Sequence, residues 1–368
     1  MNNAVIRKWM IPGPRSARPV RIALVGGDGI GPEVVGATAT CLEELRIELE
    51  LLRPAHGRET VKTLGDPCPA TFKDAVRSAD AVLFGAADGA SGVCAPILWF
   101  LRRELDTYAN IRPSTHLPAF RGRDGTDLVI VRELSEGLYP AREGTLDELR
   151  AQRLALPAIP EGPGAFAVRI ISEAATRRVA KRAAEFAMHR ARHGGRGEIC
   201  IVTKANVLKR TDGLFLEVSR AAIHEAAPGI MMRHLHVDEA ARQLVLCPEK
   251  FDVVLTSNLF GDILSDVACE AAGGIGLAPS ASLGRSSAYF EPCHGSAPDL
   301  VGKDLANPTA TLLSAAMLLA HVGHPDAAER LANAVLAVLE SGNSTRDLGG
   351  SLGTTEFTRR IVERLRAG

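Results

Sequence analysis

The sequence predicts an α/β fold, because short apolar runs typical of buried strands alternate with helical patterns along most of the chain. Its 368 residues are enough for two domains, and 46% of them are hydrophobic. Aromatic residues make up only 4%, whereas glycine is abundant with 35 residues, a mixture typical of helices packed closely on sheets. The composition therefore argues against an all-β protein.

The N-terminal part predicts a strand, a glycine-rich turn and a helix. Residues 20–25 are rich in β-branched side chains, and a helical pattern runs from Pro32 to about Glu50. The turn contains Gly27 and Gly29, but Pro32 stands where a dinucleotide-binding fingerprint needs its third glycine. We therefore expect glycines that allow a tight turn, and not a Rossmann fold.

Further elements continue the alternation. We expect strands at 79–84, 128–132, 198–203 and 251–257, and helices at 97–108, 172–193 and 312–322, the last of them buried in the core. In the helix 172–193, Ser172 is the expected N-cap and Gly194-Gly195 the expected stop. The apolar side of that helix is expected to contain Ala174, Val179, Ala183, Phe186 and Ala187. Residues 154–164 contain three prolines and two glycines and predict an excursion or arm.

Charge and cysteine usage disfavour several classes of protein. The 43 Lys+Arg residues balance 43 Asp+Glu residues, so binding of nucleic acid through bulk charge is not expected. Seven cysteines are scattered singly, which suggests neither a disulfide framework nor a zinc site. The run 312–322 is shorter than the roughly 20 residues that span a bilayer. Residues 1–19 lack the apolar region of a secretory signal, so we expect a cytoplasmic protein, with a short transit peptide as the alternative.

Two aspartates follow the predicted strand 251–257. The strand ends at Ser257 and Asn258, and Asp262 and Asp266 then lie at i and i+4 on one face of a helix. Like charges so placed repel each other unless a cation lies between them, and carboxylate oxygens suit Mg²⁺ or Mn²⁺. The alternative is that the helix dipole favours Asp262 in the first turn and that Asp266 is simply solvated.

Three arginines and one lysine lie near the ends of predicted elements. Arg102 lies on a helix, Arg112 follows it, and Arg132 ends the next buried strand. A guanidinium group binds a carboxylate in bidentate fashion, although each arginine alone is as well explained by a surface ion pair. Lys204 ends another strand with Asn206 close behind, at the edge where α/β proteins bind ligands. It is either a general base or a lysine whose stem packs along the surface.

Six motifs together resemble the β-decarboxylating dehydrogenases, the family of isocitrate, 3-isopropylmalate, homoisocitrate, tartrate and D-malate dehydrogenases. The motifs are, in order, GGDGIGPEVV, LRRELDTYANIRP, VRELSEGLY, TKANVLKRTDGLF, VDEAARQLV with FDVVLTSNLFGDILSDVACEAAGGIGLAPSASLG, and YFEPCHGSAPDLVGKDLANPTATLLSAAMLL. The resemblance implies the two-domain isopropylmalate dehydrogenase-like fold, with a large mixed sheet flanked by helices. It implies a nucleotide-binding domain from 1–107 and 273–368. Residues 108–272 would form the dimerisation and metal and substrate domain, with an arm near 150–165.

The resemblance also implies a role for each site residue. Tyr139 would act as the acid and Lys204 as the base. The substrate would be bound by Arg102, Arg112, Arg132, Leu98, Trp99 and Asn206. The divalent metal, Mg²⁺ or Mn²⁺, would be held by Asp238, Asp262 and Asp266. The nucleotide would be bound by Glu291, His294, Gly295, Ser296, Ala297, Asp299, Leu300 and Asn307. In the family Lys204 and Asp238 reach in from the neighbouring subunit, which implies a homodimer with shared active sites.

The implied reaction is oxidation of a malate derivative at C2 by NAD, followed by loss of its β-carboxylate as CO₂. The metal would act as a Lewis acid at the C2 oxygen. Asp299 would bind the hydroxyls of the adenosine ribose and repel a 2′-phosphate. Family members that use NADP carry Lys-Tyr where this chain has Asp299-Leu300, so the sequence predicts NAD.

The substituent at C3 of the substrate is expected to be apolar, as in 3-isopropylmalate. Isocitrate enzymes carry Ser and Asn in the helix before Arg102, whereas this chain offers Pro96, Ile97, Leu98 and Trp99. Trp99 either narrows the pocket for a small alkyl group or lines a wider one for an aromatic group. Homoisocitrate, isocitrate, D-malate and tartrate are the alternative substrates. A catalytically silent regulatory subunit is the alternative that is not an enzyme.

Overall fold

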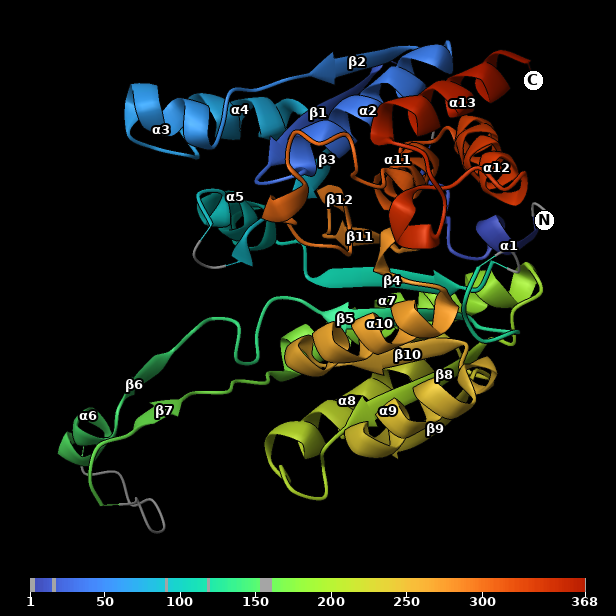
Figure 1. The fold of residues 1–368 in the computed structure, drawn as a ribbon. Helices are drawn as coiled ribbons and strands as arrows, with labels where there is room; N and C mark the ends of the chain where they lie inside the picture. The colour runs from blue at the N-terminus through green and yellow to red at the C-terminus, as the bar shows by residue number, and fades with distance from the viewer. Residues whose placement is uncertain (1–3, 15–17, 90–91, 118–119, 153–160, 368) are drawn as a thin grey trace.

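The computed structural model describes residues 4–14, 18–89, 92–117, 120–152 and 161–367. Its strands are β1 (Val20–Gly27), β2 (Leu49–Leu52), β3 (Ala81–Ala86), β4 (Ala109–Thr115), β5 (Asp127–Glu133), β6 (Glu143–Thr145), β7 (Ala165–Ala167), β8 (Glu198–Thr203), β9 (Met231–His236), β10 (Val253–Thr256), β11 (Pro279–Leu283) and β12 (Ala288–Pro292). Ten of them form one sheet in the order β2-β1-β3-β12-β11-β4-β5-β10-β8-β9 (Figure 1). β11 pairs antiparallel with β12 and β4, and β4 pairs antiparallel with β5, so the sheet is mixed as predicted.

Helices cover both faces of this sheet. They are α1 (Ala4–Arg7), α2 (Gly31–Glu44), α3 (Arg58–Leu64), α4 (Ala70–Ser78), α5 (Ala95–Trp99), α6 (Leu146–Ala151), α7 (Glu173–Arg192), α8 (Thr211–Ala226), α9 (Val237–Leu246), α10 (Asn258–Ala272), α11 (Thr309–His321), α12 (Pro325–Glu340) and α13 (Thr354–Ala367). A π-helical turn (Phe100–Glu104) continues α5, and Pro298–Leu300 forms a 3₁₀ turn. No helix in the described ranges is both long and apolar enough to cross a membrane.

The strand side chains alternate between two sets of helices. In β1, Ile22 and Leu24 join the core cluster that contains α2, α7, α8 and α11 to α13, whereas Val25 joins the cluster of α4 and α5. In β5, Val129 packs into the first cluster and Ile130 packs with α9 and α10. This period-two alternation is the signature of a sheet buried on both faces, and it gives three layers in the order helix, sheet, helix.

Two predicted helices end earlier than expected. The first stops at Glu44, because Arg46 adopts a positive φ of 51° and Leu49–Leu52 pairs in parallel with β1. The helix predicted for 97–108 stops at the π turn, and the unpredicted strand β4 follows. Pro113 argues against a strand, but β11 pairs with β4 only at 109–111, so the proline lies where that side of the ladder has ended.

The other expected elements are largely confirmed. Ser172 Oγ accepts a hydrogen bond from the backbone N–H of Ala175 at 3.2 Å, and α7 stops before Gly194, whose φ is 86°. Ala174 is exposed, so its place on the apolar side of α7 is wrong. Much of the predicted arm, residues 153–160, lies outside the described residues. The flanking strands β6 and β7 pair with each other and project away from the body of the molecule (Figure 1).

Candidate active site

A cavity of about 370 Å³ lies where β4 and β12 meet α5 and α10. Many of the predicted site residues line it: Leu98, Trp99, Arg102, Arg112, Tyr139, Asp262, Glu291, His294 and Gly295. Pro96 and Ile97 are not among the residues of its wall. Ile97 is buried in the core cluster of α4 and α5, so its predicted place in the substrate pocket is wrong. The apolar part of the wall is formed by Ala95, Leu98 and Trp99 instead.

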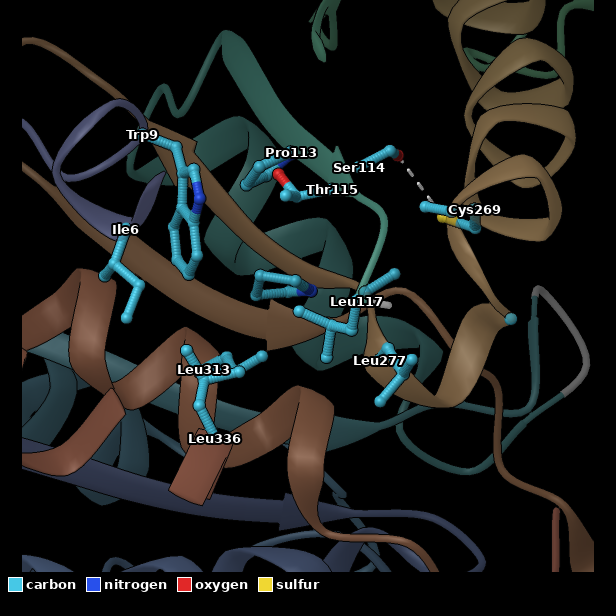
Figure 2. Close-up of a pocket in the computed structure, with 14 residues that line it drawn as sticks. Ile6, Trp9, Pro113, Ser114, Thr115, Leu117, Cys269, Leu277, Leu313 and Leu336 are labelled. Carbon is cyan, nitrogen blue, oxygen red and sulfur yellow. Dashed lines mark hydrogen bonds between the residues drawn. The ribbon is translucent and has the colours of Figure 1, made fainter. Parts of the chain in front are cut away.

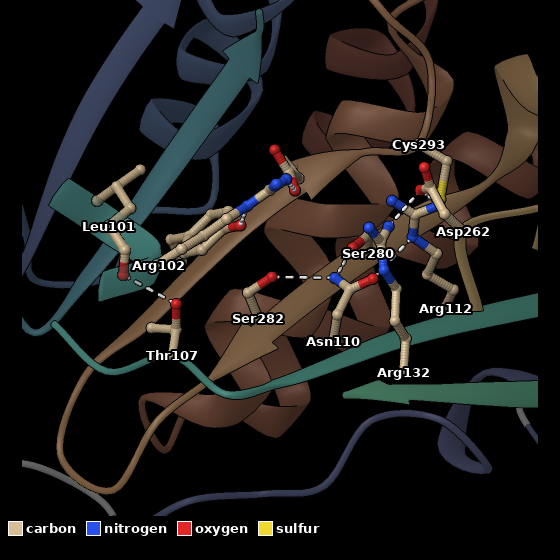
Figure 3. A network of polar contacts seen from close by, with 12 residues as sticks. Leu101, Arg102, Thr107, Asn110, Arg112, Arg132, Asp262, Ser280, Ser282 and Cys293 are labelled. Atoms are coloured by element: carbon tan, nitrogen blue, oxygen red, sulfur yellow. Dashed lines mark hydrogen bonds and ion pairs between the residues drawn. The ribbon is translucent and has the colours of Figure 1, made fainter. Parts of the chain in front are cut away.

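Arg132 and Arg112 approach Asp262 from neighbouring antiparallel strands. Arg132 is only 1% exposed, and its guanidinium donates to Asp262 and, at 2.8 and 3.0 Å, to Asn258 Oδ1. Arg112 Nη1 lies 3.3 Å from Asp262 Oδ1 (Figure 3). Burial raises the pKa of the Asp262 carboxyl, but the two guanidinium groups lower it by more, so the group is ionised at neutral pH.

Gly261 is required for this contact between α10 and Arg132. A Cβ atom at Gly261 would lie 2.6 Å from Cγ and 2.7 Å from Cβ of Arg132. Both distances are shorter than real carbon contacts, so any side chain here would displace the arginine or the helix. The glycine thus lets α10 lie directly over the buried guanidinium stem and place Asp262 beside its head.

Arg102 enters the cavity from the π-helical turn that follows α5. Its Nε donates to the Tyr289 hydroxyl at 3.0 Å, and its Nη2 lies 3.7 Å from Glu291 Oε1. Single π turns are rare in proteins, and many of those that are known lie at functional sites. Arg102, Arg103 and Arg112 thus share the cavity wall with two carboxylates, Asp262 and Glu291, and the buried Arg132 pairs with Asp262. This leaves positive charge available for an anionic ligand.

Tyr139 completes the polar wall beside Asp262. Its hydroxyl donates to Asp262 Oδ2, and the Arg132 guanidinium carbon lies 4.8 Å from the centre of its ring. Burial raises the pKa of the Tyr139 phenol, Arg132 lowers it, and the hydrogen bond to Asp262 raises it again, with a net increase. The phenol is therefore protonated at neutral pH and can act as a proton donor.

Asp266 lies one turn after Asp262 and forms the second half of the predicted metal pair. Its Oδ1 lies 4.0 Å from Arg112 Nη1, and its side chain is 62% exposed. Two carboxylates on one helix face are hard oxygen ligands that fit Mg²⁺ or Mn²⁺. Within the described part of one chain, no third side chain of a metal-binding type joins them.

Lys204 and Asp238 pair with each other, outside the wall of the cavity. Lys204 Nζ donates to Asp238 Oδ1, which lowers the pKa of that carboxyl. The backbone N–H of Lys204 donates at 2.6 Å to the buried carboxylate of Asp212, which is also bound by Arg169. Asn206 is exposed next to this pair. The three residues therefore do not join the arginines within one chain, and their place in a neighbouring subunit's site stays a prediction.

The predicted nucleotide segment 294–300 runs along two neighbouring cavities. His294 and Gly295 line the first, and Ser296 lines a second cavity of about 700 Å³ together with the N-terminal glycine turn. Gly27 and Gly29 have φ values of 78° and 58°, which confirms the predicted tight turn. A Cβ atom at Gly29 would lie 1.9 Å from the carbonyl oxygen of Ser296. The glycines therefore also let the turn pack against the nucleotide segment.

The remaining predicted nucleotide residues differ in their surroundings. Ala297 and Leu300 pack against the start of α2, and Asp299 is exposed in the 3₁₀ turn. Asn307 donates to Asp347 at 2.9 Å and accepts from the backbone N–H of Thr309 at 3.0 Å. His294 Nε2 is buried without a hydrogen-bond partner among the described residues. Such an orphaned ring nitrogen at a cavity wall fits a site that is completed by a polar ligand.

Sequence reasoning missed the residues that hold the arginines. Asn110 Oδ1 accepts from Arg112 Nε at 2.7 Å, and Ser265 Oγ accepts from Arg112 Nη1 at 2.6 Å. Asn110 is two residues from Arg112 in a strand and therefore shares its face, which is a signal that the sequence contains. No local signal identifies Tyr289. Arg103 was also missed, and it lines the cavity with its guanidinium carbon 4.7 Å from the centre of the Trp99 ring.

Known proteins resemble this chain over nearly its whole length. Residues 21–361 match the family described as isocitrate/isopropylmalate dehydrogenase. Isocitrate/homoisocitrate dehydrogenase of Thermus thermophilus is 42% identical over 351 residues, which cover 94% of this chain and 99% of that protein. The 3-isopropylmalate/3-methylmalate dehydrogenase of Methanocaldococcus jannaschii is 41% identical over 350 residues, with 94% and 99% covered.

A solved structure gives the same relationship. The crystal structure of isocitrate dehydrogenase from Methylococcus capsulatus superposes with a TM-score of 0.83 at 37% identity, and the match covers 94% of this chain and 99% of that one. The fold, the grouping of three arginines with Asp262 and Tyr139, and the sequence matches agree with one another. This chain belongs to the isocitrate/isopropylmalate dehydrogenase family and is a dehydrogenase.

Proposed function

We propose that two copies of this chain form an enzyme that catalyses the NAD-dependent oxidative decarboxylation of a (2R)-malate with a substituent at C3. The leading candidate substrate is 3-isopropylmalate. The observation that carries the proposal is that Arg102, Arg112, Asp262 and Tyr139 line one cavity, and that the buried Arg132 is hydrogen-bonded to Asp262. Residues 1–107 and 273–368 would bind the nucleotide, and residues 108–272 would form the dimer and bind the metal.

The arginines are suited to hold both carboxylates of such a substrate. Each guanidinium group presents a rigid fork of N–H donors that matches a carboxylate. Arg112 and Arg132 are fixed by Asn110 and Asn258, so little side-chain entropy is lost when the substrate binds. The cavity would therefore orient C2 and C3 of the malate relative to Tyr139.

Asp262 and Asp266, with Asp238 of the second copy, would hold the divalent cation. When bound, the cation supplies Lewis-acid polarisation of the C2 oxygen. Lys204 of the second copy would take the proton from the C2 hydroxyl, while the C2–H bond would break and its hydrogen would leave as a hydride for NAD. After the β-carboxylate leaves as CO₂, the protonated phenol of Tyr139 would deliver a proton to C3.

Cofactor preference is expected to depend on Asp299. Replacing Asp299→Lys together with Leu300→Tyr removes a negative charge that opposes a 2′-phosphate and adds a donor for it. A charge-assisted hydrogen bond is worth roughly 1.5 to 3 kcal/mol, so NADP should gain and NAD should lose by about 10- to 100-fold in kcat/KM. Leu300→Tyr alone is the matched control and should keep the preference for NAD. An unchanged NAD to NADP ratio in the double variant would place the nucleotide elsewhere.

The apolar wall of Ala95, Leu98 and Trp99 favours an alkyl substituent at C3. These side chains offer no hydrogen-bond donor to a third carboxylate except the indole N–H. Burying a carboxylate without donors is unfavourable by several kcal/mol, whereas each buried methylene contributes about 0.8 kcal/mol. A second candidate arises because Arg103 lines the same cavity and makes no ion pair in the described ranges. A substituent that ends in a carboxylate, as in homoisocitrate, could reach it.

A turnover panel separates these two candidates. We would measure kcat/KM of the wild type, Trp99→Leu and Arg103→Gln with 3-methylmalate, 3-isopropylmalate, 3-benzylmalate, isocitrate and homoisocitrate, in the presence of NAD and Mn²⁺. The wild type should prefer an alkylmalate. Trp99→Leu should change which alkyl size is preferred, and the kcat/KM ratio between substrates that differ by one methylene should change by about fourfold. Arg103→Gln should leave that preference unchanged. A wild type that prefers homoisocitrate and loses it on Arg103→Gln would establish the second candidate.

A further inference from the structure

Helix α10 carries both aspartates of the proposed metal site, and its two ends are held differently. Its last turns place Cys269 and Ala272 against a mostly apolar cavity of about 30 Å³, the space of roughly one water molecule (Figure 2). Its first turn is held by a polar contact, because Arg169 Nη2 donates to Oγ of the N-cap residue Ser257 at 3.1 Å. The guanidinium carbon of Arg169 also lies 5.3 Å from the centre of the Phe260 ring. The small cavity cannot hold a substrate, whereas the polar contact leads to a second segment of the site.

That second segment is reached through a buried ion pair between Arg169 and Asp212. The Asp212 side chain is only 1% exposed, and its Oδ1 accepts a hydrogen bond from Arg169 Nη1. Its Oδ2 accepts from the backbone N–H of Lys204 at 2.6 Å. A carboxylate offers two acceptor oxygens, so Asp212 binds both partners at once. One pair of side chains thus connects the backbone of Lys204 to the start of α10.

The backbone beside Arg169 contacts a third segment of the site. Arg169 lies between the arm strand β7 and helix α7. The next residue, Ile170, exchanges two backbone hydrogen bonds with Gly137, at 2.9 and 3.3 Å, and Gly137 lies two residues before Tyr139. Arg169 therefore lies where the segments of the proposed acid, the proposed base and the proposed metal ligands meet.

We propose that Arg169 and Asp212 are positioning residues that hold Lys204 and α10 in a fixed relation within one copy of the chain. The inference rests on the proposed function, in which Lys204 serves the site of the neighbouring copy while Asp262 serves the site of its own copy. Each ion pair would then connect the two active sites of the dimer, because it contacts the segment that supplies the base to one site and the helix that supplies metal ligands to the other.

Arg169→Lys should break this connection while it keeps the positive charge. A lysine ammonium lacks the planar fork of N–H donors, so it cannot replace the contacts with both Asp212 and Ser257. We expect kcat to fall by about 10- to 100-fold, since a displacement of about 1 Å at a catalytic group costs roughly this much. The KM of the C3-substituted malate should change less than about threefold, because the arginines of the cavity are untouched. The ratio of kcat in H₂O to kcat in D₂O should rise, because proton transfer to a misplaced base becomes slower.

Two further variants separate positioning from stability. Asp212→Asn leaves one acceptor oxygen for two donors and should repeat the kinetic effect if Arg169→Lys does not fold. The matched control is Arg190→Lys. Arg190 is 1% exposed and donates at 2.6 Å to the buried carboxylate of Asp252, which also accepts a backbone N–H, but its hydrogen bonds do not go to the three segments of the site. It should lose thermal stability and keep kcat within about twofold. An unchanged kcat in Arg169→Lys and Asp212→Asn, or an equal loss in Arg190→Lys, would overturn the proposal.

Hybrid dimers test whether the pair connects the two sites. Asp262→Ala in one copy inactivates the site of that copy and leaves one active site, which takes its lysine from the substituted copy. Arg169→Lys is then added either to the copy with Asp262→Ala, which supplies the lysine, or to the other copy, which supplies the intact Asp262. We expect turnover per dimer to fall by about tenfold or more in both hybrids. A decrease in only one of them would overturn the connection between the sites.

A measurement without substrate tests the contacts independently of the reaction. In ligand-free Arg169→Lys, the backbone amides of residues 204–208 and 257–262 should exchange with deuterium faster than in the wild type, as followed by mass spectrometry. Arg190→Lys should leave both segments unchanged. Unchanged exchange in Arg169→Lys would overturn the positioning role. No turnover of any C3-substituted malate by a wild type with slow exchange in these segments would instead overturn the proposed function.

Discussion

Asp262→Asn is expected to remove nearly all turnover while the protein keeps its fold. Asparagine has the same shape, and its remaining oxygen can still accept the hydrogen bond from Arg132, while its NH2 group faces the Tyr139 hydroxyl. It lacks the charge that a divalent cation needs. Lewis-acid stabilisation is worth several kcal/mol and each 1.4 kcal/mol is tenfold in rate, so kcat should fall by roughly 10²- to 10⁴-fold. The measurement is kcat with saturating NAD and Mn²⁺, together with circular dichroism.

A matched control lies on the same helix. Glu270 is exposed one turn after Asp266, and Glu270→Gln should keep wild-type turnover and metal affinity. Exhaustive chelation of the wild type should abolish activity, and added Mn²⁺ should restore it. Full activity after chelation, or an Asp262→Asn enzyme as fast as Glu270→Gln, would show that these aspartates do not hold a required metal.

Hybrid dimers are expected to regain activity from two inactive parents. Lys204→Ala and Asp262→Ala should each be nearly inactive as homodimers. In a hybrid, one site combines Asp262 from the first variant with Lys204 from the second and is therefore intact, and the other site lacks both. Purified hybrids carrying one tag on each variant should show about half the wild-type turnover per dimer, because a two-fold dimer has two equivalent sites.

The separation seen within one chain motivates this experiment. Lys204 contacts Asp238 and not the arginine cavity, and the two aspartates of α10 lack a third ligand among the described residues. The control is a hybrid in which one copy carries both substitutions and the other is wild type. The site on the wild-type copy then lacks Lys204 from its neighbour, and the site on the doubly substituted copy lacks Asp262. Both sites are incomplete, so this hybrid should be inactive. Verified mixed hybrids as inactive as their parents would place each site within one chain.

The sequence predicted the layers of the fold better than the ends of its elements. Short apolar runs rich in β-branched residues indicated the buried strands and local glycines indicated the turns, and both were found close to where they were expected. Boundaries were wrong where a single backbone conformation decides them, as at Arg46, whose positive φ lies between the end of α2 and the edge strand β2. Strand β4 was not predicted because a proline such as Pro113 is unfavourable within a sheet. The proline is tolerated here because β11 pairs with β4 only at residues 109–111.

The candidate site was predictable as a set of residues but not as an arrangement. The i, i+4 spacing places Asp262 and Asp266 on one face, since helix geometry is local. The contact of Arg112 with Asp262 joins positions 150 residues apart and depends on the order of strands in the sheet. The same limit applies to Ile97, which helix periodicity alone cannot assign to the core or to the cavity. Tertiary packing turns it into the core.

The most direct test of the proposed reaction is to measure NADH and CO₂ together in one assay of the wild-type enzyme. The assay contains 3-isopropylmalate, NAD and Mn²⁺, and it follows NADH by absorbance and CO₂ from substrate labelled in the β-carboxylate. We predict one CO₂ released for each NADH formed, and neither product in the presence of a chelator. NADH without CO₂, or no NADH from any C3-substituted malate despite measurable binding of NAD, would contradict the proposed function.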